Sequence, residues 1–264
     1  MAIEQLNCAS AKMPNQFRWA LAFVFAAALL SPAGAAEIRV RSPGFVYNSG
    51  LLQLAEQFTR QTGVKVTPVY DGMAAIIGHT KTATPPDDVI ALPLSLMGDL
   101  SMAEGIAPGT YTPIGRVPVA LAVKAGAPHP DISTVEKLAA ALKAGGMVMY
   151  NDPKGGSMQA LIIDGVLKRP EFAGVHGMSP ARGEGAQALS RGEGDMALQI
   201  VPEILNQKNV ELVGPLPVEL GAHMDAAVAV SARAADKENA LAFIKFITGP
   251  EARAVWKAKG LTPF

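Results

Sequence analysis

The sequence has little cysteine, no excess of charge, and no second long apolar run after its N-terminal segment. Cys8 is the only cysteine in 264 residues, and Lys plus Arg, like Asp plus Glu, number 23. A single cysteine excludes an internal disulfide framework and a cysteine metal site. A balanced charge gives no general attraction to nucleic acid or to an anionic membrane surface. We therefore expect no nucleic-acid partner and no metal.

The N-terminal segment has the order of a secretory signal peptide. Lys12 and Arg18 precede the apolar run Trp19–Leu30, and the small residues Ala33-Gly34-Ala35 follow Pro32. This run is shorter than the ~20 apolar residues that a membrane-spanning helix needs. The order of charged, apolar and small residues predicts cleavage after Ala35 or Ala36 and release into the periplasm, with nothing left in the membrane.

Strand and helix patterns alternate after this segment. Short apolar strands are expected at Ile38–Val40, Val64–Tyr70 and Asp88–Leu92. Between them lie an amphipathic helix, Leu51–Thr62, and a weaker helix, Met73–Thr80. Apolar residues at i, i+3, i+4 and i+7 support the first helix. The βαβαβ order predicts a parallel sheet and an α/β fold.

The middle and the end of the chain continue the alternation. The expected strands are Val117–Val123, Met147–Tyr150, Asp195–Val201, Val210–Val213 and Ala226–Val230. The expected helices are one capped by Ser133 with Glu136 in a capping box and ending at Leu142, then Met158–Leu167, Ala186–Arg191, one opened by Pro202, Asn239–Thr248 and Pro250–Lys259. The middle holds one β-α-β set and the two ends hold another. This layout predicts two lobes with a cleft between them, and ligands bind beyond the carboxyl ends of such strands.

Several segments together resemble a known family. They are Ile38-Arg39-Val40, Leu51-x-x-Leu54-Ala55-x-x-Phe58, Thr62-Gly63-Val64, Pro86-Asp87-Asp88-Val89, Lys124-Ala125-Gly126-Ala127-Pro128 with Asp131-Ile132-Ser133-Thr134, Phe243–Ala252, and Lys259-Gly260-Leu261. In order and spacing they resemble the molybdate-binding, type 2 periplasmic binding proteins over essentially the whole mature chain.

The resemblance implies two Rossmann-like lobes, with a discontinuous first lobe, hinged around a cleft. With the signal peptide at 1–35, we expect lobe 1 at 36–122 and 222–264, and lobe 2 at 123–221. The resemblance also implies that the lobes bind one small anion and serve an ABC permease. Separately, we expect a monomer and no cofactor, because nothing in the sequence suggests either a larger assembly or a cofactor site. In family members that bind molybdate, hydroxyls and backbone amides at helix starts hold the oxyanion, as helix N-termini favour.

Three polar positions of the molybdate site differ in this sequence. Val46 falls near the expected serine of the first loop, although Ser42 or Ser49 could substitute for it. Asp71-Gly72-Met73 replaces the Ser-Ser-Gly of the second loop, and Ile200 stands where the family supplies a tyrosine. A carboxylate at Asp71 would repel a dianionic oxyanion. These changes favour an organic carboxylate, such as a tricarboxylate, over molybdate.

Most of the candidate ligand-binding residues come from the loops that follow the strands, and Gln199 comes from the end of an expected strand. The candidates are Ser42, Gly44, Phe45, Tyr47, Asp71, Gly72, Met73, Ser157, Glu184 and Gln199. Purely structural roles for three of these residues also remain open. Asp71 is also a common turn residue, Ser157 a common helix cap, and Tyr47 an aromatic able to pack beneath the first loop.

Two classes of function remain. The chain has no Gly-x-Ser-x-Gly and no P-loop, and His79, His129, His176 and His223 have no metal-ligand spacing. The first hypothesis is a solute-binding protein for ABC uptake. The second is an isomerase, because the resemblance extends to aconitate isomerase-like members. An allylic proton shift needs poised acids and bases, and the titratable candidates are Asp71, Tyr47, Glu184 and His79.

Overall fold

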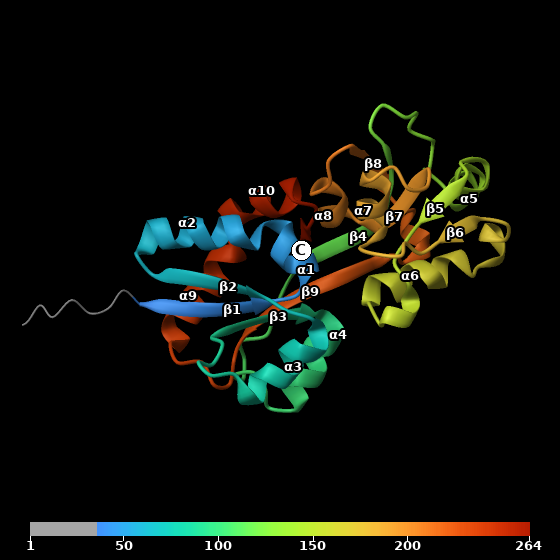
Figure 1. The fold of residues 1–264 in the computed structure, drawn as a ribbon. Helices are drawn as coiled ribbons and strands as arrows, with labels where there is room; N and C mark the ends of the chain where they lie inside the picture. Colours follow the sequence, from blue (N-terminus) through green and yellow to red (C-terminus); the bar gives the residue numbers. More distant parts are fainter. Residues whose placement is uncertain (1–35) are drawn as a thin grey trace, which may run out of the picture. The chain divides into compact units, whose positions relative to one another are not determined.

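A mixed sheet of ten strands runs through residues 36–264, the part of the chain that this computed structural model describes (Figure 1). The predicted signal peptide and Cys8 lie outside the described residues. The strand order is β2-β1-β3-β9-β4-β7-β5-β6, and β8 and β10 both pair with β4. The parallel pairs are β1 with β2, β1 with β3, β5 with β6 and β5 with β7. The predicted α/β class is therefore confirmed.

The first parallel set forms as the alternating pattern predicts. Its strands are β1 (Glu37–Ser42), β2 (Lys65–Tyr70) and β3 (Val89–Pro93), and its helices are α1 (Gly44–Val46), η1 (Tyr47–Leu51), α2 (Leu52–Thr62), α3 (Met73–Thr82) and α4 (Leu94–Met102). The apolar side of α2 buries Leu54, Ala55 and Phe58. Gly63 ends this helix in the left-handed conformation, with φ of 76°, which glycine adopts without a Cβ penalty.

The middle of the chain forms the second parallel set. Its strands are β5 (Met147–Met149), β6 (His176–Met178), β7 (Met196–Ile200) and the antiparallel β8 (Val210–Pro215). Its helices are α5 (Val135–Ala144), η2 (Pro153–Gly155), α6 (Met158–Leu167), η3 (Pro170–Phe172), α7 (Gly185–Ser190), α8 (Val201–Leu205) and η4 (Val218–Leu220). Helix α6 has the predicted bounds.

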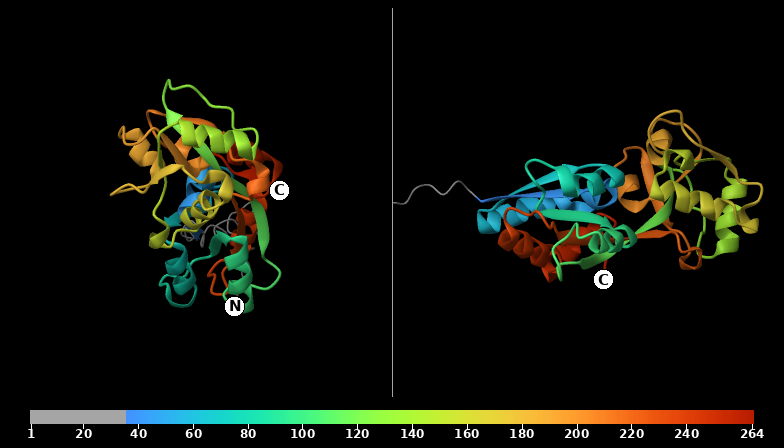
Figure 2. Two further views of the ribbon diagram at one scale, coloured as in Figure 1. Left: turned by 90° about the vertical axis from the view of Figure 1, so that its right-hand side faces the viewer. Right: turned by 90° about the horizontal axis from the view of Figure 1, so that it is seen from below.

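The C-terminal elements return to the first parallel set. They are α9 (Lys237–Ile247), α10 (Pro250–Ala258) and β10 (Thr262–Pro263). The right-hand view of Figure 2 shows α2 in blue beside the red C-terminal helices. Phe58 packs edge-on against Phe243, with ring centroids 5.3 Å apart, and Trp256 is 1% exposed. Residues from both ends of the described chain thus share one core.

Two long strands join the two parallel sets. They are β4 (Thr112–Lys124) and β9 (His223–Val230). The first part of β4 pairs with β9, and its second part pairs with β7 and β8. The predicted lobe boundary at 122/123 falls inside β4, and the one at 221/222 falls just before β9. The lobe boundaries themselves stay a prediction, because contacts join 36–264 into one unit.

The predicted cap of α5 is wrong. Thr134, not Ser133, is the N-cap, because its Oγ1 accepts a hydrogen bond from Lys137 N at 3.3 Å. The Ser133 hydroxyl lies 3.2 Å from Lys137 Nζ instead. Glu136 is then the second residue of the helix, and a capping box needs the third.

Helix α4 and strand β6 are among the elements that the sequence did not predict. Helix α4 continues directly from the apolar strand β3, so no polar boundary separates the two patterns. Strand β6 is exposed along its length, so it lacks the alternation that marks a half-buried strand. Within Ala36–Phe264, none of the helices has the length and hydropathy needed to cross a membrane.

Candidate functional site

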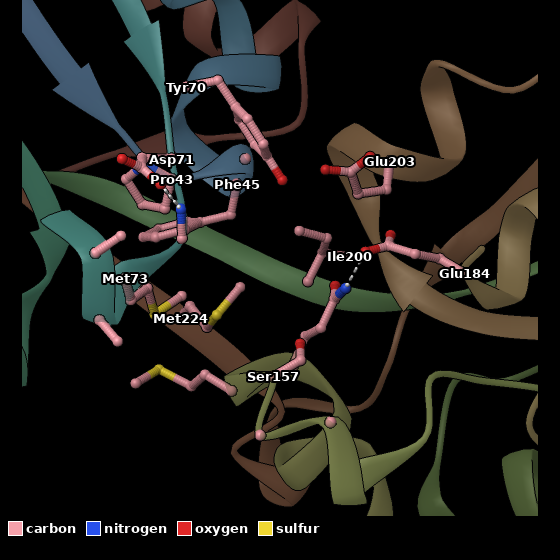
Figure 3. A pocket seen from close by; sticks show the side chains of 18 residues that line it. Pro43, Phe45, Tyr70, Asp71, Met73, Ser157, Glu184, Ile200, Glu203 and Met224 are labelled. Atoms are coloured by element: carbon pink, nitrogen blue, oxygen red, sulfur yellow. Dashed lines mark hydrogen bonds between the residues drawn. The ribbon is translucent and has the colours of Figure 1, made fainter. Parts of the chain in front are cut away.

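A cavity of about 540 Å³ lies where the two parallel sets face each other (Figure 3). Its lining comes from loops that follow β1, β2, β5, β6 and β7, with Met224 of β9 as a further member. Parallel sheets bind ligands beyond the carboxyl ends of their strands, so the cavity lies where the topology places a ligand. The lining residues are Pro43, Gly44, Phe45, Tyr70, Asp71, Gly72, Met73, Ala74, Ala75, Gly155, Gly156, Ser157, Met158, Gln159, Glu184, Ile200, Glu203 and Met224.

Helices α3 and α6 begin at the cavity. Met73, Ala74 and Ala75 form the first turn of α3, and Ser157 is the N-cap of α6. Neither N-cap residue makes a side-chain hydrogen bond to its helix. The first N–H groups of an α-helix have no partner within the helix and carry partial positive charge. Both helix starts can therefore donate to an anionic group in the cavity.

A left-handed glycine brings the chain into α6. Gly156 has φ of 70°, a conformation that non-glycine residues rarely adopt. No atom lies within 4 Å of a Cβ built at Gly155 or Gly156. The backbone beside Ser157 is thus open on its cavity side, so a ligand can approach the main chain closely.

Asp71 is paired with a buried arginine. Arg41 Nη1 donates to Asp71 Oδ2 at 2.9 Å, and Arg41 Nε donates to Asp87 Oδ2 at 2.6 Å. Arg41 and Asp87 are 7% and 3% exposed. Asp71 Oδ1 also accepts from Gly72 N at 2.8 Å. The cation offsets the negative charge of Asp71, so Asp71 repels an anion less than its sequence position suggests.

His79 lies behind Asp71 and outside the cavity lining. Its Nδ1 is 3.0 Å from Asp71 Oδ2. His79 belongs to α3 and is not among the residues that line the cavity. His79 is therefore placed to influence Asp71, and it does not face the ligand space.

Glu184 is held by two carboxamides and a helix start. Gln159 Nε2 donates to its Oε1 at 3.2 Å, and Gln199 Nε2 donates to its Oε2. Glu184 is the N-cap of α7 and forms a capping box with Gln187. A Cβ at Gly185 would lie 2.7 Å from Met149 O, so glycine allows α7 to approach β5. These contacts hold the Glu184 carboxylate at the cavity wall.

Glu203 is a second carboxyl group on the same side. Asn48 Nδ2 of η1 donates to Glu203 Oε1 at 2.8 Å, a contact between residues 155 positions apart. Burial raises the pKa of Glu203, the Asn48 hydrogen bond lowers it, and the nearby charge of Glu184 raises it further; the net shift is upward. Figure 3 shows the carboxyl groups of Glu203 and Glu184 and the ring of Tyr70 extending into the cavity.

Seven of the ten predicted ligand-binding residues line this cavity. They are Gly44, Phe45, Asp71, Gly72, Met73, Ser157 and Glu184. Their position agrees with the prediction, and their role in binding stays a prediction. The other three, Ser42, Tyr47 and Gln199, do not line the cavity.

Each of these three side chains has another partner. The buried hydroxyl of Ser42 donates to Pro43 O at 3.0 Å, and Ser49 likewise donates to Phe45 O at 2.5 Å. Tyr47 packs against Tyr70 with centroids 5.8 Å apart. Gln199 is fully buried, accepts from Ala186 N at 3.3 Å and positions Glu184. Neither first-loop serine is therefore available to replace a family serine.

Arg41, Tyr70, Gln159 and Glu203 were not predicted. An acidic residue in the first turn of a helix, as Glu203 is in α8, is common for reasons of the helix dipole. Arg41 lies within strand β1 and is not part of any recognised sequence motif. The available signal was positional, because Tyr70 ends β2 and Glu203 follows the end of β7. Among the residues the structure describes, no group of three His, Cys, Asp or Glu has metal-binding geometry.

The raised pKa of Glu203 predicts a pH-dependent stability difference. Its ordinary value is 4.5, so between pH 4.5 and the higher native value the folded state binds more protons than the unfolded state. Stability of the wild type therefore falls as pH rises through this window. Glu203→Gln does not titrate. We expect its melting temperature to exceed the wild-type value at pH 7 to 8 and to match it near pH 4. A constant difference across this range would contradict the prediction.

Comparison with known proteins identifies the family. The sequence profile of the bacterial extracellular solute-binding proteins matches residues 49–262. The chain belongs to this family. The matched range contains the second parallel set, the first set except β1 and α1, and most of the cavity lining, so the cavity is the solute-site candidate of this solute-binding protein.

Solved structures place the fold among the type 2 periplasmic binding proteins. The substrate-binding domain assigned to a molybdenum ABC transporter of Clostridium difficile gives a TM-score of 0.73 at 11% identity, covering 87% of this chain and 99% of that one. The periplasmic molybdate-binding protein of Azotobacter vinelandii gives 0.64 at 19% identity, covering 85% and 98%. The predicted resemblance is therefore confirmed at the level of the fold.

A curated relative of the solute-binding protein carries an enzyme name. It is the aconitate isomerase of a Pseudomonas species, 24% identical over 243 residues, which are 89% of this chain and 91% of that protein. The similarity thus extends over most of the length of both proteins.

Proposed function

We propose that this protein is exported to the periplasm by its signal peptide, captures a small organic carboxylate and presents it to an ABC permease. One observation carries the proposal. The uncapped starts of α3 and α6 both face the cavity, where their N–H groups can hold a carboxylate. Family membership supports the solute-binding role.

The lining between these helix starts suits an organic molecule better than molybdate. Phe45, Met73, Met158 and Met224 contribute apolar and sulfur-containing surface. Methionine adapts its shape to a varied ligand. A tetrahedral oxyanion would leave much of a 540 Å³ cavity unfilled. The first-loop serine hydroxyls are bonded to backbone carbonyls, so they do not supply oxyanion ligands.

A thermal-shift and calorimetric screen tests this proposal. The ligands are trans-aconitate, cis-aconitate, citrate, malate, sulfate and molybdate, each at the same ionic strength. We expect at least one organic carboxylate to raise the melting temperature in proportion to its concentration and molybdate to leave it unchanged. A ligand at 100 times its Kd stabilises the folded state by about 2.7 kcal/mol. A shift with molybdate alone would overturn the organic-carboxylate proposal.

An isomerase is the second candidate. The full-length similarity to an aconitate isomerase favours it, and so does the pair Glu184 and Glu203 at one wall. In an allylic shift, one carboxylate removes a proton from carbon and an acid returns a proton at the far end of the allylic system, so no redox partner is needed. Glu184, bonded by two carboxamides, fits the base, and Glu203, with its raised pKa, fits the acid.

Proton NMR separates the two candidates. The purified protein is incubated with trans-aconitate, and separately with cis-aconitate, in D₂O. An isomerase converts each isomer toward the same final ratio and incorporates deuterium at the allylic carbon. A pure carrier binds the ligand and leaves both the isomer ratio and the deuterium content unchanged at high protein concentration. Glu193→Gln, an exposed carboxyl bonded to Arg191, is the control that keeps either activity.

A further inference from the structure

The cavity contains three carboxyl groups and no lysine or arginine among its lining residues. Asp71 is offset by Arg41 at 2.9 Å. Glu184 accepts hydrogen bonds from Gln159 and Gln199 and caps α7. Neither arrangement exists at Glu203, which has one hydrogen-bond donor, Asn48, on one of its two oxygens. The three groups are therefore stabilised by different means.

No cation compensates Glu203. No salt bridge to it occurs within 36–264. The titratable groups that face it are Glu184 from α7 and Tyr70 from β2. Glu184 opposes a negative charge at Glu203, and a phenol does not neutralise one. A partly buried carboxyl group beside another carboxylate, without a cation, favours its neutral form.

Gly44 leaves the space in front of this carboxyl open. A Cβ built at Gly44 would lie 3.2 Å from the Tyr70 ring and 3.4 Å from Glu203 Oε1. Asn48 occupies Oε1 from the side of η1. Among the described residues no donor pairs with Oε2, so this oxygen is the one that a ligand can meet. Asn48 thus occupies one oxygen of this cavity-lining carboxyl group and leaves the other without a protein donor within 36–264.

We propose that Glu203 determines the specificity of this pocket as a neutral carboxylic acid, donating the proton on Oε2 to a carboxylate oxygen of the ligand while Asn48 holds Oε1. This inference rests on the proposed function and names the group that recognises the ligand. It explains how a cavity with three carboxyl groups accepts an anion. The salt bridge to Arg41 offsets Asp71, the amide groups of Gln159 and Gln199 stabilise Glu184, and the proton removes the charge of Glu203.

Calorimetry with trans-aconitate at pH 5.5, 6.5 and 7.5 tests the inference. Glutamine at 203 keeps a donor of similar size, so Glu203→Gln should bind within about threefold of the wild type at pH 5.5. As pH rises, wild-type binding should weaken relative to Glu203→Gln, because only the wild type loses its proton. Ligand titration affects both proteins equally and cancels in their ratio. Glu203→Ala removes the donor and should bind about tenfold more weakly at pH 5.5.

The chain offers a matched control. Pro250-Glu251 opens α10, and Pro202-Glu203 lies in the first turn of α8, which begins at Val201, one residue before the predicted Pro202; unlike Glu203, Glu251 is exposed. Glu251→Gln should follow the wild type at every pH. Binding by the wild type with a loss above tenfold in Glu203→Gln at pH 5.5 would overturn the neutral-donor role alone, because it would show that an ionised acceptor is required. A pH-independent ratio of the two affinities would also overturn it. Absence of binding by the wild type would overturn the proposed function itself.

Discussion

Arg41→Met is expected to lower the free energy of unfolding by about 3–5 kcal/mol, the cost of removing one partner from a buried ion pair. Arg41 lies between Asp87, which it contacts at 2.6 Å, and Asp71, at 2.9 Å. Methionine fills a similar volume without charge. Asp87, with 3% of its surface exposed, would then keep a negative charge without a strong partner.

Urea unfolding at pH 7 measures this loss, and two further variants test its cause. Arg60→Met removes an exposed arginine that lies 3.6 Å from Glu56 and should change stability by less than about 1 kcal/mol. Arg41→Met combined with Asp87→Asn should recover part of the loss, because the carboxylate left behind is now neutral. A single variant as stable as Arg60→Met would contradict the role of Arg41 in this network.

Arg41 also has a functional consequence. Its guanidinium holds Asp71 at the edge of the cavity and offsets its charge. Without it, an unpaired carboxylate would face an incoming anion, and binding of an organic carboxylate should weaken along with stability.

Glu184→Ala is expected to lower the free energy of unfolding by about 3 kcal/mol, from a lost helix cap and unpaired buried donors. The carboxylate serves Gln159, the fully buried Gln199 and the start of α7. Gln159 Oε1 already lacks a hydrogen-bond partner within the described chain, so the variant would leave both of its polar atoms unsatisfied. The cavity wall should loosen, and trans-aconitate should bind at least tenfold more weakly.

Urea unfolding and calorimetry on the same samples test this expectation. Glu193→Ala is the control, since Glu193 is exposed and bonded to Arg191 at 2.7 Å. The stability and the affinity of Glu184→Gln should lie between those of Glu184→Ala and Glu193→Ala. Its carboxamide keeps one acceptor oxygen but turns an NH₂ group toward one of the neighbouring donors. Full stability in Glu184→Ala would show that Gln159 and Gln199 find other partners.

The sequence by itself determined the elements and their class. Apolar residues at helical spacing in Leu51–Thr62, glycine at position 63 and short apolar strands are local signals, because backbone conformation depends mainly on neighbouring residues. The same local signals predicted that Asp71, Ser157 and Glu184 lie next to the ends of strands and helices. Strand ends meet at one edge of a parallel sheet, so these positions indicated the cavity.

Only the tertiary structure decided which charges meet. Arg41 and Asp71 are 30 residues apart, Gln159 and Glu184 are 25 apart, and Asn48 and Glu203 are 155 apart. No local pattern records such pairs, because each depends on how elements far apart in the sequence pack together. From the sequence, Asp71 was therefore expected to repel anions. In the fold, its negative charge is offset by the ion pair with Arg41. Glu203 looked like an ordinary residue of a helix start, and its burial and the nearby Glu184 raise its pKa.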